Sequence, residues 1–182
     1  ELELMLRPMT LEKRLSLELA ISDSLPDRVF GDRRSLVQVL MNLCANAIKF
    51  TQQGYIKISV DARQSEQTAS IRFTVEDSGI GIPEESHHRI FQHFSQADSS
   101  ITRRYGGTGL GLTISKSFAI ALGGDITVSS EVGKGSVFTA AVSTGDIEGV
   151  ELLSPEQLLM PAEQVEDDGD VYWQFPNKKL LV

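Results

Sequence analysis

Residues 70–83 have the sequence SIRFTVEDSGIGIP. Apolar and polar residues alternate up to Glu76, which is the period of a strand with one buried face. Asp77 follows directly, and Gly79 and Gly81 allow positive φ or a close backbone approach. A carboxylate held there can accept a hydrogen bond from the exocyclic amine of adenine, whereas guanine would present an oxygen. The segment therefore predicts either an adenine-selective site or an ordinary Asp-Ser-Gly turn.

The rest of the chain supplies the other elements of a sheet. Residues 55–61 (YIKISVD) alternate like 70–76, and the polar residues between the two segments predict a hairpin. Asp32 is a predicted N-cap for a helix to about Phe50, because apolar residues recur there at helical spacing. The other expected elements are a strand over 15–21, helices over 84–94 and 111–122, and strands near 125–129 and 136–143. Together they predict an α+β fold, a two-layer α/β sandwich with one mixed sheet and helices on one face.

Length and charge restrict the function of the chain. Its 182 residues correspond to one domain with a modest surplus, and 25 acids against 17 bases give a net charge of -8. An acidic surface argues against unspecific binding to nucleic acid or anionic lipid. The single cysteine, Cys44, cannot form an internal disulfide, and we expect it to be a buried helix residue. No stretch approaches the ~18 continuous apolar residues that span a bilayer.

The helix that ends near Phe50 has a polar row beside its apolar face. Asn42, Asn46 and Lys49 follow one another at helical spacing, and Gln38 lies one turn earlier. An amide oxygen is a suitable hard ligand for Mg²⁺, and a lysine one turn on can meet phosphate charge. The row predicts either a metal and phosphate site or a solvated helix face.

A glycine-rich run opens the helix expected over 111–122. Peptide N–H groups at a helix start, freed from side-chain bulk by glycine, form an anion site that phosphate suits. The run lacks the P-loop pattern and follows a polar loop rather than a strand. Arg103 and Arg104, just upstream, either close onto phosphates or remain solvated charges. The residues of the run that are candidates for binding are Gly107, Thr108, Gly109, Leu110, Gly111 and Leu112.

Five segments in this order resemble the motifs of one known family. They are MNLCANAIKFT (41–51), VEDSGIGIPEE (75–85), RIFQHFSQADSS (89–100), RRYGGTGLGLTIS (103–115) and GKGSVFT (133–139). They look like the N, G1, F and G2 boxes and the closing glycine motif of the ATP-binding catalytic domain of sensor histidine kinases. The wider family, with its Bergerat-type fold, includes DNA gyrase, the mismatch-repair ATPases and the heat-shock chaperone ATPases.

The resemblance implies an ATP pocket between sheet and helices, under a flexible lid over 95–107. By motif position Asn46 is the implied Mg²⁺ ligand, Asn42 and Lys49 are its phosphate-side neighbours, and Asp77 is the adenine acceptor. Thr139 matches a position near the adenine, although a strand hydroxyl can also have no special role. The glycines implied to contact ATP through their backbone are Gly79, Gly81, Gly107, Gly109 and Gly111. Phe91 and Phe94 match the F box and are expected to pack at the root of the lid.

The family also implies a reaction, the donation of the γ-phosphoryl group of Mg-ATP to a histidine on a separate dimerisation domain. Nothing here matches the phosphoacceptor pattern, and His87, His88 and His93 are expected to be solvated surface residues. Phosphoryl transfer needs that nucleophile in line with the γ-phosphate, so this chain alone should bind ATP without completing the reaction. The alternatives are a degenerate nucleotide-binding regulatory module and a gyrase- or chaperone-like ATPase. The ATPase ranks last, because no acid in the N box is clearly placed to activate water; Gln38 stands one turn before Asn42.

The chain is expected to be a piece of a longer protein and to lie in the cytoplasm. Whether that longer protein is anchored in a membrane lies outside these residues. Residues 1–14 are expected to end a connector from a preceding helical domain, although the pattern of 1–12 is ambiguous, and 15–145 are expected to form the catalytic domain. Residues 146–177, with nine acids, predict an acidic linker in which 171–175 can dock locally. Residues 178–182 resemble the first strand of a response-regulator receiver domain, which implies a hybrid kinase. The expected partners are the dimerisation and receiver domains, with no nucleic acid and no direct membrane contact.

Overall fold

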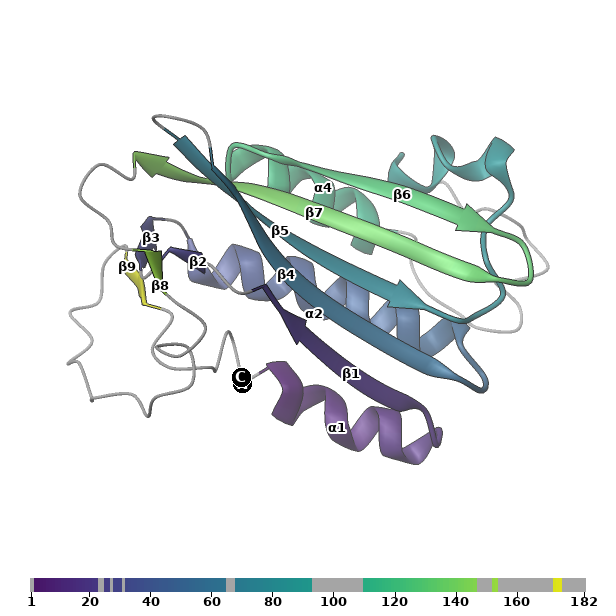
Figure 1. Cartoon of the computed structure of the whole chain (residues 1–182). Coiled ribbons are helices and arrows are strands. Elements are labelled where there is room, and N and C mark those ends of the chain that lie inside the picture. The colour runs from purple at the N-terminus through teal and green to yellow at the C-terminus, as the bar shows by residue number, and fades with distance from the viewer. Residues whose placement is uncertain are drawn as a thin grey trace.

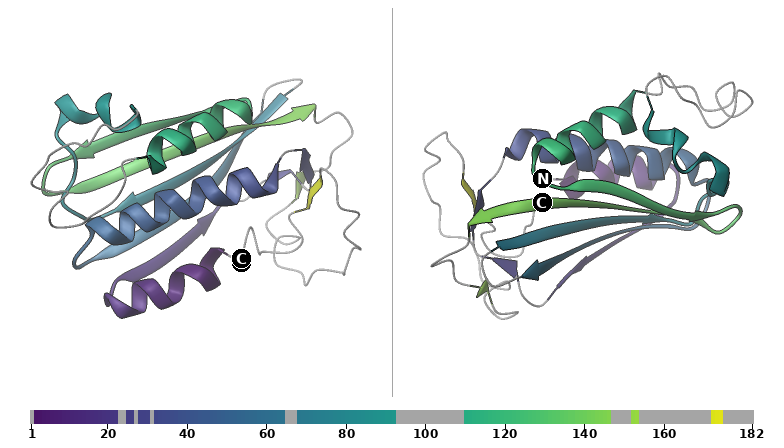
Figure 2. Two further views of the ribbon diagram at one scale, coloured as in Figure 1. Left: turned by 180° about the vertical axis from the view of Figure 1, so that it is seen from behind. Right: turned by 90° about the horizontal axis from the view of Figure 1, so that it is seen from above.

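A five-stranded mixed sheet, in the order β1-β4-β5-β7-β6, carries the helices α1, α2 and α4 on one face (Figures 1 and 2). The computed structural model describes residues 2–22, 25–26, 28–30, 32–64, 68–92, 110–146, 152–153 and 172–174. The strands of the sheet are β1 (Ser16–Ile21), β4 (Tyr55–Gln64), β5 (Thr68–Asp77), β6 (Asp125–Glu131) and β7 (Gly135–Asp146). The helices are α1 (Leu2–Glu12), α2 (Arg33–Phe50) and α4 (Gly111–Ala121). The predicted α+β sandwich with one mixed sheet is confirmed.

Strand direction and register bring the sequence motifs to one end of the sheet. β1 runs parallel to β4, and the remaining neighbours are antiparallel. Along β5 the residues Phe73 and Val75 are buried toward the helices, so the period of two places Asp77, the last residue of the strand, on the same face. Asp77 pairs in register with Ile56 of β4 and Ser136 of β7.

The long helix α2 begins where its sequence predicts. The carboxylate of Asp32 accepts hydrogen bonds from the backbone N–H groups of Arg34 (2.8 Å) and Ser35 (3.2 Å), and the Ser35 hydroxyl donates to its other oxygen. These bonds, the Ser35 hydroxyl first, lower the pKa of Asp32. Cys44 is buried, and desolvation raises the pKa of its thiol to about 12, as expected for a packing residue. The other buried residues of α2 are Leu36, Val39, Leu40, Leu43, Ala47 and Ile48.

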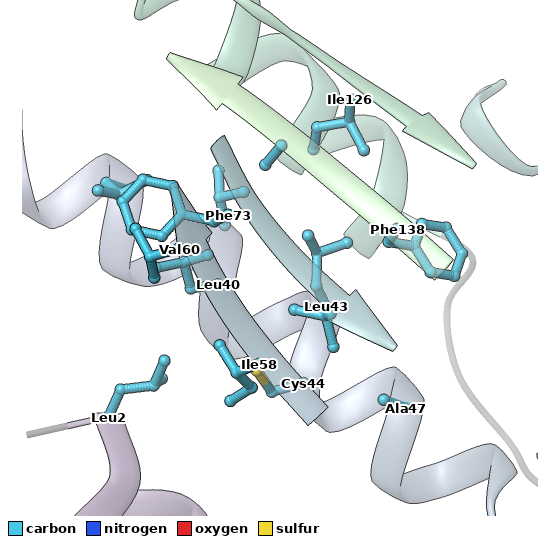
Figure 3. Packing of buried hydrophobic residues seen from close by; sticks show 14 of the residues in the cluster. Leu2, Leu40, Leu43, Cys44, Ala47, Ile58, Val60, Phe73, Ile126 and Phe138 are labelled. Carbon is cyan, nitrogen blue, oxygen red and sulfur yellow. The ribbon is translucent and has the colours of Figure 1, made fainter. Parts of the chain in front are cut away.

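The apolar side chains of α2 pack directly onto the sheet (Figure 3). Leu40, Leu43 and Cys44 lie in one cluster with Ile58, Val60 and Phe73 of β4 and β5. Burial of a large apolar side chain is worth about 1.5–3 kcal/mol. This contact therefore fixes α2 over the middle of the sheet, and with it the polar row that begins at Asn42.

The first helix, α1, belongs to the same hydrophobic core. Leu2 and Leu6 are buried in the cluster that contains α2 and the sheet. The helix closes with two backbone bonds, Arg14 N to Leu11 O (3.0 Å) and Leu15 N to Thr10 O (2.9 Å), and Arg14 takes φ +56°. This is a Schellman motif with arginine at the left-handed position that usually holds glycine.

Lys13 connects the end of α1 to the end of α2. Its Nζ donates to the carbonyl oxygens of Ile48 (2.6 Å), Lys49 (3.0 Å) and Thr51 (3.4 Å). The last carbonyls of a helix have no partner within it and carry the negative end of its dipole. The ammonium therefore satisfies the C-terminus of α2 at the place where the helix reaches Asp77.

The helix predicted over 84–94 is wrong in type and extent. The structure has two separate 3₁₀ turns, η1 (Glu84–Ser86) and η2 (Arg89–Phe91). Their backbone bonds span three residues, from His87 N to Glu84 O (3.1 Å) and from Gln92 N to Arg89 O (3.0 Å). Each turn is only three residues long and places one residue in the interior, Ser86 in η1 and Ile90 in η2. Residues 93 and 94 lie outside the described part.

Two short two-stranded sheets lie beyond the other end of the main sheet (Figure 1). Leu25–Pro26 (β2) pairs with Leu152–Leu153 (β8), and Arg28–Phe30 (β3) pairs with Tyr172–Gln174 (β9), both antiparallel. Residues 172–174 thus dock locally, within a segment predicted to be a linker. The start of the predicted receiver strand, 178–182, lies outside the described residues.

Candidate functional site

The end of β5 holds a buried carboxylate. Asp77 is 5% exposed, and its Oδ1 accepts a hydrogen bond from the backbone N–H of Gly79 at 2.8 Å. The backbone N–H of Ser136 also bonds to the carboxyl group. Burial raises the pKa of Asp77 and the neighbouring charge of Glu76 adds to this, while the two N–H groups offset part of the rise. An acceptor of this kind, with little access to water, is strongly selective for a donor on a ligand.

Glycines allow the backbone to close around this carboxylate. A Cβ on Gly135, where φ is +112°, would stand 1.9 Å from the carbonyl oxygen of Asp77. A Cβ on Gly81, with φ +69°, would stand 2.0 Å from the carbonyl oxygen of Glu131. At Gly79 a Cβ would meet Asp77 Oδ1 at 2.8 Å. The predicted roles of Gly79 and Gly81 in close backbone approach therefore have a direct steric basis.

Ser136 is a candidate that the sequence reasoning missed. It lies opposite Asp77 in the β5–β7 register, is buried, and has its Oγ 2.9 Å from Ser130 Oγ. Thr139, the residue named from the motif, lies elsewhere. Because Phe138 and Ala140 are buried toward the helices, Thr139 faces the other side of the sheet, where its register partners are threonines of β5 and β6. The glycine immediately before Ser136 was the available signal.

The polar row of α2 meets the start of α4. Asn42 Nδ2 donates to Ser115 Oγ at 2.7 Å, and Ser115 is buried. A Cβ on Gly111 would lie 2.4 Å from Asn42 Oδ1, so the first residue of α4 and the amide are in close contact. The structure therefore joins two of the predicted segments, N box and G2 box, through a residue pair 73 positions apart.

Asn46 and Lys49 continue the row along α2. Asn46 is one turn beyond Asn42 on the same side of α2, and the residue is partly exposed. The ammonium of Lys49 lies 5.0 Å from the centre of the Phe50 ring. We name Asn42, Asn46, Lys49, Gly111 and Ser115 the amide end of the site, and Asp77, Gly79, Gly81, Gly135 and Ser136 the carboxylate end.

Aromatic packing fixes the segment that leads toward the predicted lid. The rings of Phe91 and Phe138 meet edge-on, with centroids 6.4 Å apart and an interplanar angle of 78°. Lys116 of α4 places its Nζ 4.8 Å from the centre of the Phe91 ring. Phe91 thus packs between β7 and α4, as expected for the F box. His87 Nε2 lies 3.1 Å from Ile82 O, and His88 is exposed.

Several predicted site residues lie outside the described part of the chain. They are Arg103, Arg104, Gly107, Thr108 and Gly109, together with Phe94, His93 and most of the predicted lid. Leu110 and Leu112, at the start of α4, are partly buried, and Leu112 packs against the core.

The residues at hand restrict how a divalent cation could be held. Among the described residues, no three His, Cys, Asp or Glu side chains gather in a way that could hold a metal ion. A cation at the amide end would be coordinated by an amide oxygen and by oxygens of the bound molecule. This suits Mg²⁺, because Mg²⁺ commonly keeps water and phosphate oxygens. Within the same residues no helix is long and apolar enough to cross a bilayer.

Comparison with known families gives one match over most of this structure. A family model described as histidine kinase-, DNA gyrase B-, and HSP90-like ATPase matches residues 31–145, a range that includes all five motifs.

Curated relatives are similar over the same region. The chain is 48% identical over 128 residues to the signal transduction histidine-protein kinase BarA of Escherichia coli, which covers 70% of this chain and 14% of that protein. It is 47% identical over 135 residues to the hybrid signal transduction histidine kinase B of Dictyostelium discoideum, over 74% of this chain and 7% of that protein. The chain thus spans a small part of these relatives.

Solved structures agree in fold. The crystal structure of full-length ShkA in complex with AMPPNP gives a TM-score of 0.68 at 32% identity, over 78% of this chain and 28% of that chain. The catalytic domain of histidine kinase ThkA, in a nucleotide-free form, gives 0.64 at 28% identity, over 79% of this chain and 90% of that one.

Proposed function

Since this chain belongs to the histidine kinase-, DNA gyrase B- and HSP90-like ATPase family and carries a histidine kinase catalytic domain, we propose that it binds Mg-ATP and donates the γ-phosphoryl group to a histidine on a separate dimerisation domain. The sequence-based prediction of the family, its ATP-binding fold and its place in two-component signalling is confirmed. The individual ATP contacts, the metal and the partners of the reaction are the proposed part.

The observation that carries the proposal is the buried carboxylate at the end of β5. Two backbone N–H groups donate to the carboxylate of Asp77, which is almost fully buried. A ligand that reaches this carboxylate must therefore supply a hydrogen-bond donor. The exocyclic amine of adenine supplies such a donor, whereas guanine would place a carbonyl oxygen, a second acceptor, against the carboxylate. The carboxylate end therefore suits a purine base with an exocyclic amine at that edge.

We place the triphosphate at the amide end. Asn42, locked by Ser115, and the first peptide of α4 at Gly111 lie side by side there, and a helix start favours anionic groups. Lys49 follows on the same side of α2 and contributes positive charge. Ser136 replaces Thr139 in our assignment of the adenine contacts, because Thr139 lies on the far face of the sheet.

Asn46 is the proposed metal ligand. Its amide oxygen is a neutral hard donor one helical turn from Asn42, which fits an ion that receives most of its shell from phosphate and water. When bound, Mg²⁺ neutralises charge on the phosphate oxygens. The residues of the chain hold and orient the substrate, and Lys49 offsets part of its negative charge.

The accepting histidine is supplied by another domain in this proposal. His87 rests against the carbonyl of Ile82 and His88 is exposed on the 3₁₀ segment, which supports a surface role for both. The hybrid kinase among the relatives supports a receiver domain as a further partner. We place the reaction in the cytoplasm, where ATP is available, with no nucleic acid and no membrane contact by residues 15–145.

Binding of nucleotides tests the site assignment. We expect Mg-ATP to bind by calorimetry with at least about tenfold higher affinity than Mg-GTP, because guanine leaves two acceptors facing each other at Asp77. Equal affinity for the two nucleotides would refute the adenine assignment.

Transfer tests the reaction. A dimerisation domain taken from a similar kinase and added in trans should acquire acid-labile, histidine-linked phosphate from labelled ATP. Binding without transfer would instead support the regulatory module, and steady phosphate release by this chain alone would support the gyrase-like ATPase.

A further inference from the structure

Thr51 carries a buried hydroxyl whose function is not explained by the fold. It is the residue directly after α2, and its side chain is 0% exposed. Its N–H donates to Ala47 O at 3.1 Å and its carbonyl accepts from Lys13 Nζ, so the backbone of the residue is satisfied. Its Oγ1, however, has no hydrogen-bond partner among the described residues. A buried hydroxyl without a partner is costly, and proteins rarely keep one without a use.

The hydroxyl lies next to the carboxylate of Asp77. The position that a Cβ on Gly79 would occupy is 2.9 Å from Thr51 Oγ1 and 2.8 Å from Asp77 Oδ1. The two oxygens therefore flank the same face of Gly79. They are near enough to be joined by a single water.

Asp77 can use a further donor. Its Oδ1 already accepts from the N–H of Gly79, but a carboxylate has about four lone-pair sites. Burial raises the pKa of Asp77, and each further donor that faces the carboxylate offsets part of that rise. The hydroxyl of Thr51 is a neutral donor on the Oδ1 side of the Asp77 carboxylate. Donation at Oδ1 would hold the carboxylate plane and leave Oδ2 for the amine of the base.

We propose that Thr51 is a positioning residue for adenine recognition, which acts by orienting the carboxylate of Asp77 through its hydroxyl. The proposal rests on the proposed ATP site and assigns a specificity-determining residue within it. Nucleotide binding should then depend on the hydroxyl only when the base carries the amine that Asp77 receives.

The experiment compares two nucleotides on the full chain. Affinities for Mg-ATP and for the Mg-triphosphate of purine riboside, which has hydrogen in place of the 6-amino group, are measured by calorimetry. Thr51→Val, which has the same shape without a donor, should weaken ATP binding by about tenfold. It should change binding of the purine riboside nucleotide by less than about twofold, because that base makes no bond to the carboxylate. Thr51→Ser, which keeps the hydroxyl, should restore ATP binding to within about threefold of the unaltered chain.

Thr113 provides a matched control. It is a threonine of α4 that is 5% exposed, and its Oγ1 likewise has no partner among the described residues. Thr113→Val should leave the ratio of the two affinities unchanged. The melting temperature of free Thr51→Val should not fall, since the variant removes an unpaired hydroxyl; should that variant not fold, Thr51→Cys takes its place in the same comparison.

Three results decide the matter. An equal loss of both nucleotides in Thr51→Val would show a general packing role and overturn the proposal. No loss of either would overturn it as well. If the unaltered chain binds ATP no better than the purine riboside nucleotide, the adenine assignment of Asp77 fails instead, which is a failure of the proposed function and is recognisable before any variant of Thr51 is made.

Discussion

The two ends of the site are built by different means. The carboxylate end is made of backbone, since β5 and β7 pair at Asp77 and Ser136 and a glycine brings two main chains within van der Waals contact. The amide end is made of side chains on two helices, joined by the bond from Asn42 to Ser115. Main chain in a sheet cannot move without breaking its register, whereas a side chain can rotate. We therefore expect the carboxylate end, which faces the base, to be rigid, and the amide end, which faces the phosphates, to be adjustable.

The largest effect is expected for Gly135→Ala. The added methyl would stand 1.9 Å from the carbonyl oxygen of Asp77, and φ at this position is +112°, so both the clash and the strain must be relieved by moving a strand. We expect a loss of at least about 3 kcal/mol in the free energy of unfolding, measured by urea denaturation.

Gly133→Ala is the control for strain alone. Its φ is +82°, but no described atom lies within 4 Å of the added carbon, so we expect a loss of about 1 kcal/mol. Equal losses of unfolding free energy in the two variants would contradict the expected clash, because they would show that backbone strain alone accounts for the effect at Gly135.

Asp77→Asn should separate binding from stability. The amide would present a donor to the adenine amine, so we expect the affinity for Mg-ATP to fall about 100-fold by calorimetry. The melting temperature of the free chain should not fall, because burial raises the pKa of Asp77 and thus disfavours its ionised form. Asp61→Asn, a change of the same charge at the Arg72 ion pair of β4 and β5, should leave ATP affinity unchanged.

The same carboxylate predicts two opposed pH trends. Because its folded pKa is raised above the ordinary value of 3.8, ionised Asp77 destabilises the fold fully above the raised pKa and not at all well below 3.8. Its contribution to the free energy of unfolding therefore falls as pH rises through that window. ATP affinity should change the other way and decrease as pH falls through the raised pKa; calorimetry at a series of pH values should show this decrease in the unaltered chain and none in Asp77→Asn.

Gly111→Ala tests the adjustable end. The methyl would meet the Asn42 side chain, which can rotate away, and alanine is the better helix former. We expect the free energy of unfolding to change by less than about 1 kcal/mol while Mg-ATP affinity falls about tenfold, since the displaced amide leaves Ser115. A large loss of stability here would show that the amide end is as rigid as the carboxylate end.

The smallest effect is expected for Arg14→Gly, outside both ends. Arg14 has φ +56° at the close of α1, where glycine carries no steric penalty, so the free energy of unfolding should rise by about 0.5–1 kcal/mol in urea denaturation. Arg14→Ala keeps the strain and should give no such gain. Mg-ATP affinity should be the same in all three proteins, because neither end of the site contains this residue.

Local pattern predicted most of the elements. The alternation in the sequences of β1, β4 and β5 and the cap at Asp32 are signals that neighbouring residues carry by themselves, and they were sufficient to predict these three strands and α2. The prediction for 84–94 failed because the proline and acids at its start suit the first turn of an α-helix and of a 3₁₀ turn alike, and the sequence did not separate the two.

The site was predictable only in part, for a physical reason. Asn42, Asp77 and Gly79 lie in recognisable motifs, but the bond from Asn42 to Ser115 joins residues 73 positions apart and depends on how α4 packs on α2. The distinction between Ser136 and Thr139 likewise depends on the register of β5 with β7, which decides the face that each residue occupies. Thr51 closes the N-box segment, but the sequence does not show that its hydroxyl is isolated, because that is a property of the folded interior.

The three bonds from the ammonium of Lys13 have a mechanical consequence. These bonds of 2.6, 3.0 and 3.4 Å are lost when donor and acceptor separate by about 1 Å, so they oppose movement of the end of α1 away from the last turn of α2. Together with the packing of Leu2 and Leu6 in the common core, they couple the position of the N-terminal helix to the segment around Thr51, beside Asp77.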